Sequence, residues 1–227
     1  MTINVYWACL EEEWMRAEAP APVLAPFVKG HSNEKSVISC PGIRDALTNV
    51  YSIKSIYDYE FSFVNTVTMS SMYTQEFFDK HVITRNIHER LFSFSQEFIF
   101  FTDAPSLMVT GNLMPYMERN NVTKNCVPIP GSYDIGKWFR PIEFAFFMPE
   151  DVDTFKVEQG EIFQYIQFHT PEKINLIPFR PSEKVLKLLK ETMLSRNNKK
   201  FATHLEYFYK TFKLKKQLLA EIKENIL

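Results

Sequence analysis

Short apolar and aromatic stretches, rather than long helical repeats, fill most of the chain before Arg180. Their β-branched and aromatic residues favour strands, and Pro, Gly and Asn residues separate them. We predict strands at Thr2–Leu10, Val50–Ile56, Glu60–Thr68, Leu107–Leu113, Cys126–Ile129, Ile142–Met148, Phe155–Val157, Glu161–His169 and Lys173–Phe179. Further strand is expected in the aromatic run Phe92–Phe100. Many short strands with frequent turn signals are typical of a β-sandwich or barrel.

Three other local patterns lie within this β-rich region. The prolines of Ala19–Pro26 favour a stiff, extended connector. Short helices are expected at Pro41–Leu47 and Gln75–Lys80. The second and third predicted strands are separated by a short segment with the turn-favouring Asp58, so we expect these two strands to pair.

The pattern becomes helical after Arg180. Ser182 is placed to cap the first turn of a helix, because its side-chain oxygen can accept from a backbone N–H of that turn. The last segment has apolar residues three or four positions apart, on one helical face: Phe201, Leu205, Phe208, Phe212, Leu219, Ile222 and Ile226. We expect this face to dock on the sheets of the same chain. A contact with a helix of another subunit is the alternative.

Together these patterns predict a mainly β protein, with one β-sandwich-like domain at residues 1–180 and an amphipathic, basic helical extension at 181–227. The composition supports a substantial core, since 45% of the 227 residues are hydrophobic and 21 are Phe. Charge is uneven: the segment from Arg180 to Leu227 has 12 Lys or Arg and 5 Asp or Glu. This asymmetry fits either a helix docked on its own acidic domain or a tail that meets an acidic partner.

Several function classes lack their sequence signatures. Neither a G-x-G-x-x-G nor a P-loop motif occurs, and the chain has only 6 Gly, which argues against Rossmann and P-loop nucleotide binding. None of the 5 His falls in an H-x-H, H-x-D or H-E-x-x-H motif, so we expect no metal site. Cys9, Cys40 and Cys126 form no C-x-x-C and are expected to be free thiols.

Location and nucleic-acid binding can be judged in the same way. No run of about 18 apolar residues occurs, and the first residues do not read as a signal peptide, so neither a membrane span nor export is expected. The aromatic residues near Lys199–Lys210 already satisfy the amphipathic helical pattern. They do not require a nucleic-acid ligand, and we do not expect one.

The most informative segment runs from Gly131 to Phe168. It begins with a turn-rich stretch that contains the carboxylate of Asp134 and continues into a predicted strand. Gly160 then suits a tight turn with a positive φ, before a strand that carries Gln164. The segment therefore holds a carboxylate in a loop beside two paired strands.

This layout resembles the late core of the dUTPase and dCTP-deaminase family, which has a Gly-x-x-Asp loop, a strand, and then a Gly-x-x-[Ile]-x-Gln strand. Gly131 and Asp134 match the first element, and Gly160 and Gln164 loosely match the second. Asp58 stands where that family has an early Tyr-Asp motif. The resemblance implies a β-clip-like fold, in which Asp134 orients the attacking water and the sugar.

The same resemblance supplies the catalytic and ligand-binding candidates. Asp134 and Asp58 would be catalytic, with Asp58 helping to hold phosphates bound to Mg²⁺, the only cofactor implied. Tyr133, Arg140 and Gln164 are the ligand-binding candidates. The chain departs from the family where Arg-Ser-Ser is expected, and basic helices stand in place of the Gly-rich C-terminal arm.

A second resemblance covers more of the chain, from about Asn4 to Phe179. The runs Tyr51–Glu60, Phe100–Asp103 and Tyr133–Arg140 are similar to uncharacterised proteins of large tailed phages of marine bacteria. This resemblance implies a phage-encoded protein that works in the virion or in the host cytoplasm, and it carries no activity.

We therefore expect a non-enzymatic structural or interaction domain that binds a protein partner or itself. Its interface candidates are Trp138, Phe208, Phe212 and Lys216, because exposed aromatic and cationic residues often anchor interfaces. A nucleotide-binding or nucleotide-hydrolysing protein like the dUTPase family is the alternative.

Overall fold

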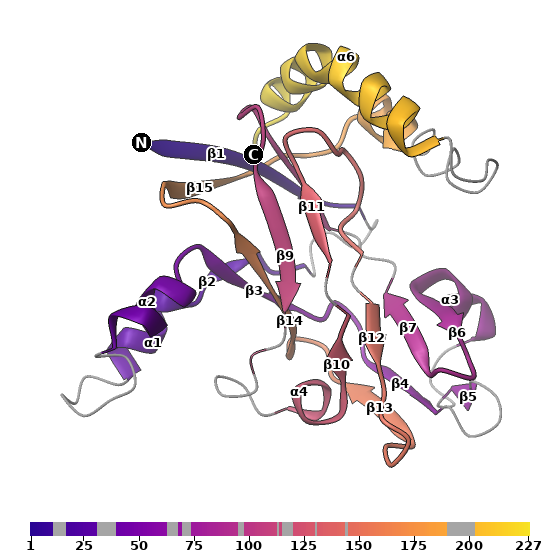
Figure 1. The fold of residues 1–227 in the computed structure, drawn as a ribbon. Coiled ribbons are helices and arrows are strands. Elements are labelled where there is room, and N and C mark those ends of the chain that lie inside the picture. The colour runs from indigo at the N-terminus through magenta and orange to yellow at the C-terminus, as the bar shows by residue number, and fades with distance from the viewer. Residues whose placement is uncertain are drawn as a thin grey trace.

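The computed structural model describes residues 1–10, 17–30, 40–62, 68–69, 74–94, 98–112, 114, 120–129, 131–143, 145–189 and 203–227. In this part the chain is mainly β with a long helix near its C-terminus, as the sequence predicts (Figure 1).

The strands are β1 (Thr2–Cys9), β2 (Ala21–Pro22), β3 (Val50–Lys54), β4 (Tyr59–Ser62), β5 (Thr68–Met69), β6 (Val82–Asn86), β7 (Leu91–Phe94), β8 (Phe98–Thr102), β9 (Met108–Asn112), β10 (Val127–Pro128), β11 (Ser132–Asp134), β12 (Ala145–Phe147), β13 (Thr154–Val157), β14 (Ile162–Phe168) and β15 (Lys173–Pro178). The helices are α1 (Leu24–Gly30), α2 (Pro41–Ala46), α3 (Gln75–His81), α4 (Asn121–Asn125) and α6 (Thr203–Glu224). Residues 183–189 are also helical.

The described strands form four sheets. Their orders are β15-β1-β8, β11-β9-β14-β3-β2, β10-β12-β7-β6 and β13-β4-β5. Each order ends in two different edge strands, so these sheets are open and the described part resembles a sandwich rather than a barrel.

The predicted pairing of the two strands on either side of Asp58 is wrong. β3 pairs with β14 and β2, whereas β4 pairs with β13 and β5. The reason is a corner at Ser55, whose N–H donates to the Glu161 carbonyl at 2.8 Å and whose carbonyl accepts from the Gly160 N–H at 2.9 Å. At this corner two neighbouring antiparallel segments pass together from one sheet to another. One segment leads from β3 to β4, and the other leads from β13 to β14. Gly160 has a φ of 85°, as the sequence suggested.

The predicted connector Ala19–Pro26 is also more ordered than expected. β2 pairs with β3, and α1 begins at Leu24, with Pro26 in its first turn where a missing N–H costs nothing. Val23 drives this arrangement, because its side chain is buried against Leu47 and its N–H donates to the Val50 carbonyl at 3.0 Å.

The central strands β1 and β8 are buried on both faces. On one face, Val5 and Trp7 join the main core between the sheets. On the other face, Tyr6 and Ala8 belong to a second core that includes residues of the C-terminal helices. The absence of alternating polar positions in both strands follows from this double burial.

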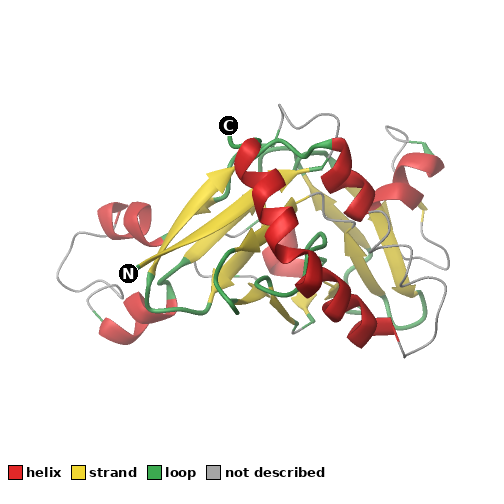
Figure 2. Cartoon of the chain, turned by 90° about the horizontal axis from the view of Figure 1, so that it is seen from above, coloured by secondary structure: helices red, strands yellow, loops and turns green. Residues whose placement is uncertain are grey.

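The helical extension forms the cover over that second face. Figure 2 shows α6 lying across the strands. Leu218 and Ile222 of α6 are buried, as are Val185 and Leu189 of helix 183–189. The Ser182 hydroxyl accepts from the Val185 N–H at 3.4 Å, in the predicted capping position. The predicted docking on the protein's own sheets is therefore present over residues 214–224. Phe201 and the side chains of Leu205, Phe208 and Phe212 lie outside the described residues.

Candidate functional site

Asp134, the leading catalytic candidate, lies at the end of β11, in a turn whose carboxylate is surrounded by donors. Its Oδ1 accepts from the backbone N–H groups of Leu107 and Gly136, each at 3.0 Å. Its Oδ2 accepts from the Ser106 hydroxyl at 2.7 Å and from the Lys137 ammonium at 2.8 Å. Four donors thus engage the two oxygens, and the side chain is 12% exposed. The carboxylate fixes one loop against another.

Electrostatics at Asp134 favour the charged form. Partial burial alone would raise the pKa of this carboxyl, but the hydrogen bonds from Lys137, Ser106, Leu107 and Gly136 outweigh it and hold the pKa below 3.8. The folded state therefore binds this proton less readily than the unfolded chain does. The resulting stabilisation is present above the ordinary pKa and is lost as the pH falls through the folded-state pKa.

We predict that Asp134→Asn lowers the free energy of unfolding at neutral pH by about 1–2 kcal/mol, because the amide nitrogen cannot accept from Ser106 and Lys137. Urea unfolding of both proteins at several pH values measures this difference, which should shrink as the pH falls below 3.8. Asp151→Asn, at an exposed carboxylate, is the matched control. A difference that stays constant with pH would mean that the charge of Asp134 contributes nothing.

Lys215 of α6 connects the helical extension to the same loops. Its Nζ donates to the carbonyl of Ala104 at 2.5 Å and to that of Gly136 at 2.8 Å. It also lies 5.5 Å from the centre of the Phe101 ring. Burial lowers the pKa of Lys215, while the nearby Asp134 acts in the opposite direction. Lys215 therefore holds α6 against the two loops that contain Ala104 and Gly136.

The candidates Tyr133, Trp138 and Arg140 form a second cluster, centred on Glu143. Trp138 stands edge to face with Tyr133, with ring centres 5.6 Å apart, and the Arg140 guanidinium lies 5.1 Å from the Trp138 ring. Arg140 donates to the Glu143 carboxylate at 3.1 Å, and the Tyr133 hydroxyl donates to the Glu143 carbonyl. Arg85 of β6 donates to the same carboxylate.

This cluster joins the loop after β11 to the sheet that contains β6 and β7. The Glu143 side chain is only 9% exposed and also accepts from the Ser93 hydroxyl at 2.8 Å. Removing one partner of such a hydrogen-bonded charge pair leaves the other charge buried and uncompensated, which destabilises the fold. Arg140 and Tyr133 therefore have structural contacts that account for their positions.

Asp58 and Asp134 do not meet. Asp58 accepts from the Gln159 N–H at 2.7 Å, just before β14 begins. Asp134 pairs in register with Met108. The Met108 carbonyl accepts a hydrogen bond from the backbone N–H of His169, just after β14 ends. The two carboxylates thus stand at opposite ends of β14, a strand of 7 residues that spans about 20 Å. Within one copy of the chain, Asp58 and Asp134 therefore do not line a common site.

Gln164 occupies the interior of the same strand. Its side chain is 1% exposed, and its register partner is Ile53 of β3. Gln164 therefore does not face solvent. The sequence pattern could not reveal this, because β14 is covered on both faces and its polar residue does not mark a wet side.

The interface candidates receive uneven support. Trp138 is half-buried between Tyr133 and Arg140, and Lys216 is exposed on α6. Phe208 and Phe212 lie on α6, and their side chains are outside the described part. Their role in an interface remains a prediction.

Other candidate chemistries find little support in the described residues. The three cysteines, Cys9, Cys40 and Cys126, all lie in the described part and form no disulfide bond. Burial raises the pKa of the Cys126 thiol to about 12, which makes it a poor nucleophile at neutral pH. Within the described ranges, no group of three or more His, Cys, Asp or Glu is placed to hold a metal ion. No helix in those ranges is long and apolar enough to cross a bilayer.

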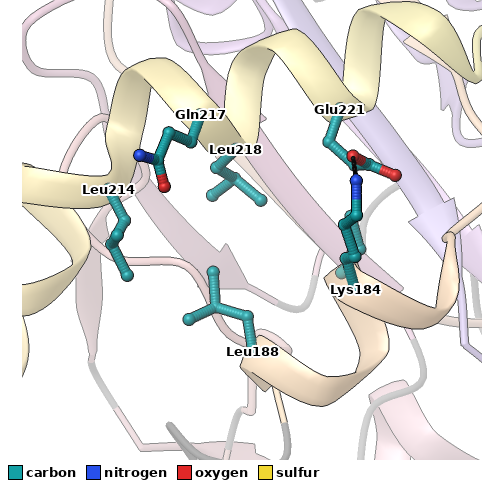
Figure 3. A pocket seen from close by; sticks show the side chains of 7 residues that line it. Lys184, Leu188, Leu214, Gln217, Leu218 and Glu221 are labelled. Atoms are coloured by element: carbon teal, nitrogen blue, oxygen red, sulfur yellow. Dashed lines mark hydrogen bonds and ion pairs between the residues drawn. The ribbon is translucent and has the colours of Figure 1, made fainter.

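Sequence reasoning missed a groove between helix 183–189 and α6. It has a volume of about 440 Å³, and its apolar lining is Val185, Leu188, Leu214 and Leu218. Figure 3 shows Leu188 pointing across this groove toward Leu214 and Leu218. The i, i+4 spacing of 214 and 218 was a usable signal. The spacing does not predict the neighbouring helix 183–189, which forms the second wall of the groove.

No known protein family, curated protein or solved structure matches this chain.

Proposed function

We propose that this protein is a non-enzymatic interaction domain that binds a protein partner or a second copy of itself. One observation carries the proposal: the carboxylate of Asp134, on which a nucleotide-hydrolysing function would depend, is engaged by four donors of its own fold. A catalytic carboxylate must have an oxygen available to orient a water or a proton. Here the hydrogen bonds within the fold occupy the carboxylate.

The placement of the other polar candidates supports the same proposal. Asp58 lies at the far end of β14, and Arg140 pairs with Glu143. The groups that would bind a nucleotide are therefore separated or engaged elsewhere. The helical extension, by contrast, offers exposed lysines and an apolar groove, which are features of protein-binding surfaces.

The resemblance to proteins of large tailed marine phages bears on where such a domain would act. We propose that it works either as a virion component or on a protein in the host cytoplasm. A domain of either kind needs a stable scaffold and a binding surface, and it needs no cofactor.

Titration calorimetry with a panel of nucleoside triphosphates and Mg²⁺ tests the proposal. We expect no binding heat at millimolar nucleotide, for the wild type and for Asp134→Asn alike. In parallel, light scattering should detect self-association, or pull-down from the infected host should enrich a stoichiometric partner. Saturable nucleotide binding that Asp134→Asn removes would overturn the proposal. A strictly monomeric protein that enriches no partner would do the same.

A further inference from the structure

We draw no further inference here: the strongest candidate, the apolar groove between helix 183–189 and α6, carries none because nothing in the described part of the chain shows what covers it.

Discussion

Replacing Phe92 with alanine is expected to lower the free energy of unfolding by about 3–5 kcal/mol, the usual cost of emptying a fully buried aromatic position. Phe92 is 0% exposed and lies at the centre of an aromatic cluster between two sheets. Its ring is 5.2 Å from that of Phe61 and 5.3 Å from that of Phe155, both from the β13-β4-β5 sheet. It is 5.7 Å from Phe146 on its own sheet. Alanine would leave a cavity that these rings cannot fill without moving.

Urea or thermal unfolding of the purified variant measures this effect. Phe92→Leu keeps much of the volume and should cost less than half as much. Met108→Ala provides a surface control, because Met108 is 38% exposed and its loss should change stability by only about 0.5 kcal/mol. A Phe92→Ala protein as stable as the Met108→Ala protein would show that this cluster does not hold the two sheets together.

Replacing Gly136 with alanine is expected to destabilise the protein by about 1–3 kcal/mol, through overpacking of a close contact between loops. A Cβ at this position would lie 2.9 Å from the Ala104 carbonyl oxygen and 2.9 Å from the backbone N and Cα of Ser106. These are backbone atoms, so the clash is relieved only by separating the loops. Separation would also strain the bonds that Asp134 and Lys215 make to them.

Gly131 provides a closely matched control, since a Cβ there would meet nothing within 4 Å. Gly131→Ala should therefore unfold at nearly the same temperature as the wild type. Calorimetric melting of both variants compares the two positions directly. Equal melting temperatures would indicate that the loops can part at little cost, and that the contact at Gly136 does not fix the docking of α6.

The candidate site was predicted in part from the sequence. The Gly-x-x-Asp spacing singled out Asp134, whose carboxylate does organise the turn after β11. The assignment of a catalytic role depended on Asp58 reaching the same place. Strand register decides that distance, and β14 keeps the two carboxylates apart. The groove between helix 183–189 and α6 was not predicted, because residues of both helices form it. The sequence pattern of one helix alone does not indicate it.

Local chemistry explains the structural features that the sequence determined by itself. Apolar stretches predicted most of the strands, but not β6 or β11. Ser182 predicted the start of helix 183–189, and Gly160 predicted a turn with positive φ. These features depend on residues within a few positions of one another. The local backbone preferences of these residues do not depend on contacts with distant parts of the chain.

Only the tertiary structure decided which strands pair and what covers them. β3 and β4 follow each other in sequence, yet they do not pair, because the corner at Ser55 moves the chain to another sheet. Each instead has one partner more than 90 residues later, β14 for β3 and β13 for β4. Likewise, the apolar run of β1 predicts that the strand is buried, but it does not predict which segments cover it. Helix 183–189 and α6 supply that cover through Leu189 and Ile222. Burial is a property of contacts between distant segments, and no local pattern contains it.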